Sequence, residues 1–91
     1  MNQEENKQAQ EKILAVKRAH EAELLAKAHV VGCGVGYRRK AGKPTSILAL
    51  VVLVDRKVPT HLLSAWDAIP AEIDGIPVDV QEIGLLTAHP S

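Results

Sequence analysis

The apolar positions follow a helical period in the first third of the chain. Residues 2–28 contain no glycine or proline and are rich in Glu, Lys, Gln, Ala and Leu, which favours one continuous helix. Ile13, Val16 and Leu24 fall on one broad side of this helix, so we expect that side to face the core. Lys27 would then lie in the last turn, where a positive charge suits the helix dipole. The polar first dozen residues have little to bury, and we expect them to fray.

A second row of small apolar residues follows the other side of the predicted helix. Its four members are Ala15, Ala19, Ala22 and Ala26. In one interpretation, alanine stands there because it favours the helix on a solvated face. In the other, the row is a smooth seam against which a second helix packs closely.

A strand with one face of nearly bare backbone is predicted for residues 29–39. Side chains alternate between the two faces of a strand, so every second residue points the same way. One face carries Val30, Gly32, Gly34 and Gly36, and the opposite face carries Cys33 between valines. Glycine inside a strand usually marks a bulge or the close approach of another backbone. A loop at residues 40–45 follows, indicated by its glycine and proline.

The clearest strand is residues 46–54, which include a run of eight consecutive apolar residues. Such a run is typical of a strand that is buried on both faces, so we place it in the centre of the sheet. Residues 60–66 predict a short helical turn with Thr60 as its N-cap. We expect the apolar side chains of that turn to face inwards, namely Leu62, Leu63 and Trp66.

The last predicted strand is preceded by Asp74–Gly75, a strong signal for a two-residue turn. Residues 76–83 broadly alternate between apolar and polar, as in a half-exposed strand. Pro77 favours an edge position there, because proline cannot donate a ladder hydrogen bond.

These elements predict an α+β fold, in which a long N-terminal helix packs on a small, mostly antiparallel, three-stranded sheet. Strand 46–54 is central in this prediction, with 30–39 and 76–83 on its flanks. The expected organisation is a helix over 1–28, a compact core over 29–84 and a C-terminal tail over 85–91.

Composition limits the class of protein. A chain of 91 residues holds one small domain, and its single cysteine cannot form an internal disulfide. The formal net charge is zero, which argues against bulk electrostatic capture by nucleic acid or an anionic membrane. No apolar run approaches the ~20 residues that span a bilayer, and the polar N-terminus is unlike a signal peptide. We therefore expect a cytoplasmic protein.

Charge is balanced in total but separated along the chain. Residues 36–57 hold six basic side chains against one acidic, a net charge of +5, whereas residues 58–91 hold five acidic and no basic side chains. The candidates for charge complementarity are Arg38, Arg39, Lys40, Lys43, Asp74, Asp79 and Glu82. The two segments could attract each other within one chain or between neighbouring chains, and the sequence leaves both possibilities open.

Candidate catalytic chemistry is weak. The Gly-x-Gly-x-Gly spacing at 32–36 differs from the dinucleotide-binding fingerprint, and a turn rather than a helix follows it. Cys33 lacks a histidine partner, because His29 stands roughly 13 Å away along the same strand. The four histidines show no metal-ligand spacing. We predict no enzyme activity, no cofactor and no metal.

Three stretches in linked order resemble the module that precedes the peptidase domain in a group of bacterial trypsin-like serine peptidases. They are VVGCGVGYRRKAGKPT, LALVVLVDRKVP and IPAEIDGIPVDVQEIG, and the preceding AELLAKAHVVG also fits. The resemblance implies an N-terminal α+β segment without catalytic residues of its own. The chain departs from that pattern at Cys33, where the family has an aliphatic residue, and at 64–67, where Trp66 replaces a more polar stretch.

A self-associating structural or scaffolding module is the function we expect. One helix covers only one face of a three-stranded sheet, so the other face of the central strand would lie open unless copies associate. The interface candidates are Ala15, Ala19, Ala22, Ala26, Gly32, Gly34, Gly36, Leu48, Leu50, Val52 and Trp66. The partner would be the chain itself, in a homo-oligomer or, where head-to-tail contacts do not close, in a filament.

Two other functions remain as alternatives. The first is a regulatory or targeting module for a separate trypsin-like peptidase, which would add a strand to the sheet edge or bind the glycine face. The second, less favoured, is contact with nucleic acid through the basic residues 38–43, where Tyr37 alone offers a stacking surface.

Overall fold

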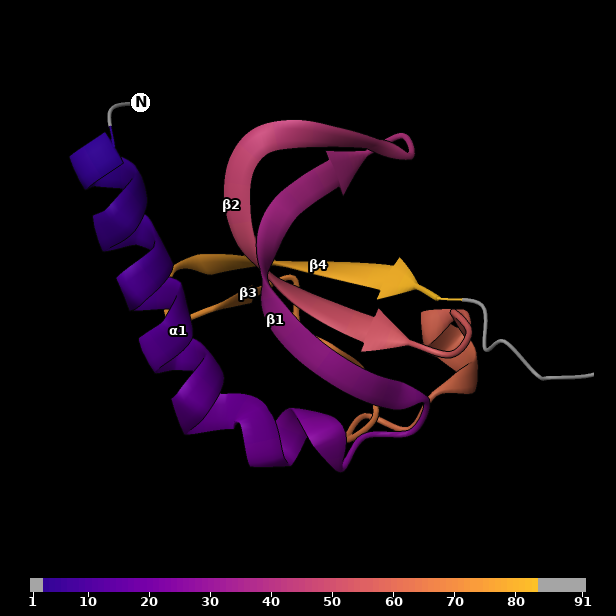
Figure 1. Ribbon diagram of the computed structural model, residues 1–91. Coiled ribbons are helices and arrows are strands. Elements are labelled where there is room, and N and C mark those ends of the chain that lie inside the picture. Colours follow the sequence, from indigo (N-terminus) through magenta and orange to yellow (C-terminus); the bar gives the residue numbers. More distant parts are fainter. Residues whose placement is uncertain (1–2, 84–91) are drawn as a thin grey trace, which may run out of the picture.

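The computed structural model describes residues 3–83, which form one helix layer on one mixed sheet (Figure 1). The elements are α1 (Gln3–Leu25), β1 (Val30–Lys40), β2 (Lys43–Val54), the 3₁₀ helix η1 (Thr60–Leu62), β3 (Glu72–Ile73) and β4 (Ile76–Glu82). The α+β class is confirmed. The predicted tail at 85–91 and the predicted helix start at Asn2 lie outside the described residues.

Helix α1 packs on the sheet through the side that the sequence indicates. Ile13, Val16 and Leu24 are buried. The segment expected to fray is helical from Gln3 onwards. The helix ends at Leu25 rather than three residues later, and His29 adopts a left-handed φ of 70° before β1 begins. No basic residue therefore lies in the last turn, contrary to the prediction for that turn.

Strands β1 and β2 form an antiparallel hairpin that is longer than the sequence suggests. Lys40 pairs with Lys43, so the loop predicted at 40–45 is a two-residue turn. Ala41 and Gly42 occupy it with φ values of 53° and 78°. Positive φ at both central residues is the geometry of a type I′ turn, whose twist suits a hairpin. The sequence did not predict this two-residue turn, because alanine at position 41 gives no signal for a left-handed conformation.

A bulge near the start of β1 changes which residues share a face. Val30 pairs with Val54 and Gly32 with Leu53, so Val31 is an extra residue without its own partner. Val30 consequently packs against the core on the same side as Cys33, and not with the glycines as predicted. A bulge shifts the alternation by one residue, which the sequence pattern does not reveal.

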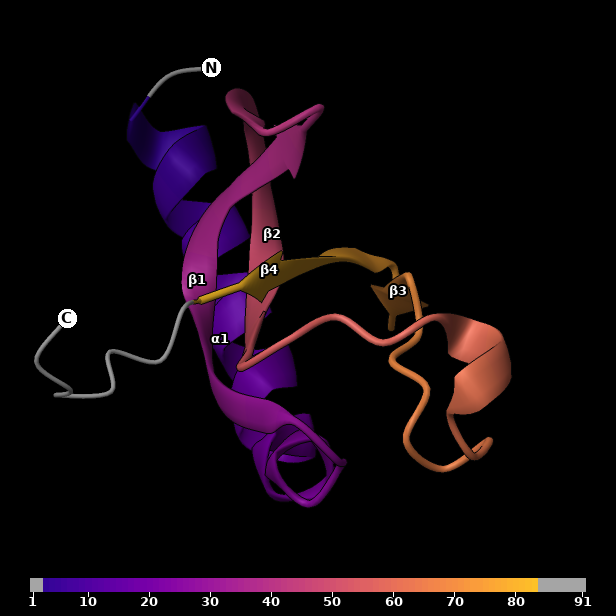
Figure 2. The ribbon, with the colours of Figure 1, turned by 90° about the vertical axis from the view of Figure 1, so that its right-hand side faces the viewer.

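The sheet has four strands rather than the predicted three, in the order β1-β2-β4-β3. Strand β4 pairs with β2 as expected but runs parallel to it, because residues 55–71 carry the chain back before β4 starts. The Asp74–Gly75 turn is confirmed, with φ values of 51° and 80°. It joins β4 to the short β3, so Pro77 pairs with Glu72 and does not stand on an edge strand (Figure 2).

Strand β2 is central, as predicted, and is buried on both faces. Beneath α1, the core contains Leu48, Leu50 and Val52, which are 8%, 0% and 0% exposed. These three residues are therefore not surface interface candidates, because helix α1 covers them. On the other face, Ala49 and Val51 are also buried.

The glycine face of β1 explains why the second face of β2 is not open. A Cβ atom added at Gly36 would lie 2.9 Å from Val51 Cγ2, and one added at Gly32 would lie 3.8 Å from Leu53 Cδ1. Side chains of β2 therefore lie against the bare backbone of β1. The expectation of an open apolar sheet face is wrong, because side chains of β2 occupy the space over Gly32 and Gly36 of β1.

Two alanine substitutions on the glycine face of β1 test this packing. Gly36→Ala should reduce the free energy of unfolding by about 1–3 kcal/mol, as overpacking of a tight site does. Gly34→Ala is the matched control, because a Cβ there meets nothing within 4 Å, so its stability should stay within about 0.5 kcal/mol of the wild type. Urea denaturation measures both, and equal effects at the two positions would contradict the packing described.

Candidate interaction surface

The outer edge of β1 is the most prominent unpaired feature of the sheet. β1 is the terminal strand on one side, and the terminal strand on the other side is β3, which has two residues. Within residues 3–83, no strand pairs with the outer edge of the 11-residue β1 (Figures 1 and 2). An edge strand presents a row of outward N–H and C=O groups that can pair with another chain.

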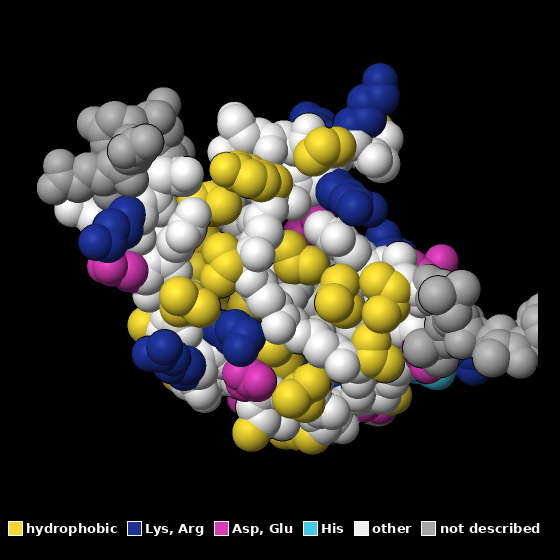
Figure 3. Space-filling model, viewed as in Figure 1, with side chains coloured by type: hydrophobic (Ala, Val, Ile, Leu, Met, Phe, Trp, Pro, Cys, Tyr) yellow, Lys and Arg dark blue, Asp and Glu magenta, His cyan; other side chains and the backbone are white. Residues whose placement is uncertain are grey.

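Exposed apolar side chains accompany this edge. Val31 is 45% exposed and Tyr37 is 46% exposed, near opposite ends of the strand. Figure 3 shows hydrophobic side chains gathered on both sides of the backbone where β1 faces the viewer. We call the outer edge of β1, together with Val31 and Tyr37, the β1 edge.

The side of α1 next to β1 adds to this surface. The charges of Lys17 and Glu21 act on Cys33 of β1, which places their side of the helix towards that strand. The two form an ion pair at 2.8 Å. Leu14 and Leu25 follow at helical spacing on the same side and are both partly exposed. An apolar stripe interrupted by one ion pair therefore runs beside the β1 edge.

Cys33 is unsuited to nucleophilic chemistry. It is partly buried against the core, and burial raises the pKa of its thiol, with the Glu21 carboxylate adding to the effect. A raised pKa keeps the thiol protonated, and the thiolate is the reactive form. The position agrees with a packing role for this residue.

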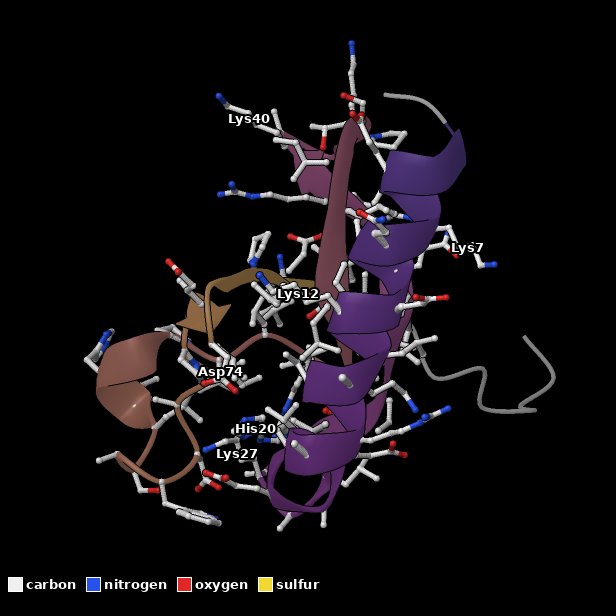
Figure 4. All side chains as sticks on the ribbon, turned by 90° about the vertical axis from the view of Figure 1, so that its left-hand side faces the viewer. Lys7, Lys12, His20, Lys27, Lys40 and Asp74 are labelled. Carbon is white, nitrogen blue, oxygen red and sulfur yellow. The ribbon has the colours of Figure 1, made fainter. Side chains whose placement is uncertain are left out.

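The hairpin tip carries the basic candidates. Arg38, Arg39, Lys40 and Lys43 are all exposed. Lys40 points away from the rest of the molecule in Figure 4. The tip forms the far end of the β1 edge.

The acidic candidates are divided between two places. Asp79 accepts a hydrogen bond from the Arg39 N–H at 3.0 Å, and Glu82 accepts one from the Lys57 N–H at 2.7 Å. Both bonds join the acidic segment to the basic segment within one chain, through the backbone. Asp74 lies instead beside His20 of α1, 3.1 Å from its Nε2 (Figure 4).

Two carboxylates that sequence reasoning did not select lie at the start of the β1 edge. Asp55 Oδ1 is 3.0 Å from His29 Nδ1. Asp67 accepts hydrogen bonds from the Ala28 N–H and from the Ser64 hydroxyl, each at 2.9 Å. The Ala28 N–H, followed by the Ser64 hydroxyl, lowers the pKa of Asp67. No motif marks these residues, because the pairs form only when the segment after β2 folds back onto the end of the helix.

The segment around η1 faces outwards more than predicted. Leu62 is 67% exposed and Trp66 is 55% exposed. Trp66 lies on Lys27, whose Nζ is 4.8 Å from the ring centroid and also donates to the Trp66 carbonyl. The prediction that these apolar side chains point inwards is wrong for both residues, since the Lys27 side chain occupies the inner position. Thr60 as N-cap lies outside the side chains that the structure describes.

The alanine row is exposed along its whole length. Ala15, Ala19 and Ala22 lie on α1, whereas Ala26 follows its last residue. The two interpretations of the row, solvated face or helix seam, therefore both remain predictions.

An open cavity of about 250 Å³ lies beside the carboxyl ends of β2 and β4. Apolar side chains dominate its wall, among them Val54, Leu63 and Ile69. Its polar members are His29, Arg56, Lys57 and Asp67, and of these His29 and Asp67 have side-chain partners in the chain. Within residues 3–83, no three His, Cys, Asp or Glu side chains form a group that could hold a metal ion.

In residues 3–83 the fold is a small α+β domain with a mixed sheet and one long edge, that of β1, which no described strand pairs with. Residues 7–83 match the family described as the NARROW LEAF 1 N-terminal domain, and the chain belongs to that family. A comparison with the curated proteins gave no match. No helix in the described part of the chain is long and apolar enough to cross a membrane.

The family match corrects the expectation drawn from the three resembling stretches. NARROW LEAF 1 is a plant protein family, so the assignment to a module of bacterial trypsin-like peptidases is wrong. Those stretches correspond to the β1–β2 hairpin, to β2 with the segment that follows it, and to the β3–β4 hairpin. A pattern of strands and turns can look alike in families that differ.

Asp67 generates a prediction about acid stability. Its pKa is lower in the folded chain than the ordinary value of 3.8, so the folded state favours the charged carboxylate. The resulting stabilisation is present above the unfolded pKa and is lost as the pH falls through the lower, folded pKa. Asp67→Ala should therefore unfold at a lower temperature at neutral pH, and the difference from the wild type should shrink as the pH falls below the ordinary pKa of 3.8.

Thermal unfolding followed by circular dichroism across pH measures this effect. Asp67→Asn is the control, because the amide oxygen still accepts from the Ala28 N–H but carries no charge. Parallel pH curves for the wild type and Asp67→Ala would show that this carboxylate does not couple protonation to folding.

Proposed function

We propose that this chain is a non-catalytic structural module that associates with copies of itself into a closed homo-oligomer. The observation that carries the proposal is the β1 edge. It is 11 residues long and is unpaired within the described residues, and it carries exposed apolar side chains at Val31 and Tyr37. Soluble monomers usually avoid such an edge.

The usual devices that protect an edge stand at the two ends of β1. Arg38, Arg39 and Lys40 place positive charge near the tip, where the register also shifts between Tyr37 and Arg39. The bulge at Val31 interrupts the start of the strand. The stretch between them, residues 32–37, pairs in regular order with β2 and contains no charged residue. A regular, uncharged central stretch is suited to pairing with another strand.

The shape and the small core also support association. The radius of gyration is 14.2 Å, above the roughly 12 Å expected for a compact chain of this length. Large hydrophobic side chains stay exposed on several elements, namely Leu14, Leu25, Val31, Tyr37, Ile47, Leu62 and Trp66. A domain this small hides only about 60% of its unfolded surface, so further burial between copies would add stability.

The structure also narrows the ways in which copies could meet. Sheet-to-sheet stacking through Leu48, Leu50 and Val52 has no support, because α1 covers these residues. A filament held together by opposite charges has little support, because Asp79 and Glu82 already accept hydrogen bonds within the chain. The β1 edge, the alanine row and Trp66 remain as candidate contacts.

The two alternative functions have less support. A role with a separate peptidase depended on the resemblance that the family match overturns. Nucleic-acid contact has in its favour the exposed basic tip, with the exposed Tyr37 beside it. A gel-shift titration in low salt with RNA and DNA oligonucleotides tests that alternative, since binding through phosphates weakens steeply with salt.

Light scattering coupled to size-exclusion chromatography tests the proposed function. The expected mass is a small multiple of 9.8 kDa at high micromolar concentration and falls on dilution. Because the candidate contact consists of main-chain groups and apolar side chains rather than ion pairs, the mass should change little between low and high salt. A constant mass of 9.8 kDa at every concentration would contradict the proposal.

A further inference from the structure

We infer that the open cavity beside the carboxyl ends of β2 and β4 binds a small monocarboxylate with an apolar body, of the size of octanoate. The inference is independent of the proposed self-association, because no part of it uses the β1 edge. It follows from the wall of the cavity, its volume and the charged side chains that line it.

The wall of the cavity is continuous with the core. Val54 is 3% exposed and belongs to the buried cluster, and Ile69 and Val80 pack against that cluster. Val58 and Leu63 complete the apolar part of the wall from the segment that joins β2 to β3. Figure 2 shows this segment as the wide loop that leads to η1 and β3. An apolar ligand group would therefore contact the core and the loop at once, as in most small-molecule sites.

The volume limits the ligand to a small molecule. An apolar cavity of about 150 Å³ accommodates one benzene molecule. At the same density, the cavity of about 250 Å³ corresponds to a ligand of about ten heavy atoms. Octanoate matches this size, whereas a long-chain lipid would leave most of its chain in water.

Two cations without a partner favour an anionic head group. Arg56 and Lys57 both line the cavity and are both exposed. Within residues 3–83, no carboxylate forms an ion pair with either side chain. A guanidinium can bind a carboxylate through two parallel hydrogen bonds, and such charge-assisted bonds are stronger than neutral ones.

The acidic side chains around the cavity are engaged within the chain. Asp67 accepts hydrogen bonds from a backbone N–H and from a hydroxyl. Asp55 faces the imidazole of His29. Glu82 accepts from the Lys57 N–H. The cationic side chains are therefore the charged groups at the cavity that a ligand can still pair with.

The place of the cavity in the sheet agrees with ligand binding. Strands β2 and β4 run parallel, and Val54 and Val80 bring their carboxyl ends to the cavity. The connection that follows β2 leaves the sheet at this point. In open parallel sheets, ligands bind in the crevice outside the carboxyl ends of the strands, where connections diverge.

A titration followed by nuclear magnetic resonance tests the inference. The 91-residue chain with labelled methyl groups is titrated with octanoate and, separately, with octylammonium and octanol. The three ligands have chains of the same length and differ in the charge of the head group. We expect saturable shifts with octanoate at the methyl groups of Val54, Leu63, Ile69 and Val80. Its dissociation constant should be at least tenfold lower than that of either matched ligand.

Removal of the two cations tests the contact with the head group. The double variant Arg56→Gln, Lys57→Gln changes exposed side chains, so the fold should persist by circular dichroism. The dissociation constant for octanoate should rise at least tenfold and approach that of octanol. The matched control is the double variant Arg38→Gln, Lys43→Gln, which removes two exposed cations of the hairpin tip and should bind as the wild type does. Equal losses in the two double variants would show that binding follows overall charge and not this cavity.

A filled cavity tests the contact with the apolar body. Leu63→Trp enlarges a residue of the wall and should abolish saturable octanoate binding. Leu62→Trp is the matched control, because Leu62 is the neighbouring residue, is 67% exposed and does not line the cavity. Unchanged octanoate affinity in a folded Leu63→Trp protein would contradict the inference. If Leu63→Trp does not fold, the double variant at Arg56 and Lys57 decides the question.

The remaining outcomes separate this inference from the proposed function. Octylammonium that binds as tightly as octanoate, or octanoate shifts that do not saturate and spread to Leu14 and Tyr37, would overturn the inference. A chain that is monomeric by light scattering and binds octanoate at the cavity would uphold it while refuting the proposed function. An oligomeric chain without saturable shifts at the cavity would do the reverse.

Discussion

The structure depends on the burial of β2 on both of its faces. Beneath α1, Leu48, Leu50 and Val52 form the row against which Ile13, Val16 and Leu24 pack. On the other face no helix is present within the described residues, and Val51 lies against the bare backbone of Gly36 instead. A central apolar strand needs a cover on each side, and here one cover is a helix and the other is the neighbouring strand itself. The glycines of β1 are what make the second cover possible, because any side chain at Gly36 would displace Val51.

This packing has a consequence for the surface. Since β1 is used to cover β2, it ends the sheet, and no other described element covers its outer side. The connection after β2 returns the chain to the opposite edge, where β3 and β4 lie (Figure 2). Apolar exposure is therefore moved from the face of the sheet to its edge, at Val31 and Tyr37. An edge of this kind is suited to pairing with another strand.

The fold also decides where the basic and acidic segments of the sequence meet. The separation of basic and acidic segments along the sequence suggests attraction between chains, but the fold brings β4 close enough for Asp79 to accept from the Arg39 N–H. Asp55 and Asp67 were not among the candidates, and they cluster with His29 and Ala28 just before β1. The basic tip of the hairpin and the carboxylates beside His29 and Ala28 therefore lie at opposite ends of β1.

The sequence by itself determined the α+β class, the long helix with its buried side, the central position of β2 and the Asp74–Gly75 turn. These follow from local periodicity and turn chemistry, which short stretches of sequence contain in full. Only the tertiary structure decided the bulge at Val31, the parallel pairing of β4 with β2, and the outward position of Trp66. Each of these depends on which segments meet in space. The one-residue bulge inverts the alternation of side chains between the two faces of β1, and the crossover after β2 sets the direction of β4. The side chain of Lys27 lies in the inner position that the apolar pattern assigns to the Trp66 ring. The expectation that Leu48, Leu50 and Val52 lie at the surface fails for the same reason, because their burial depends on what lies over each face of the sheet and not on their own hydrophobicity.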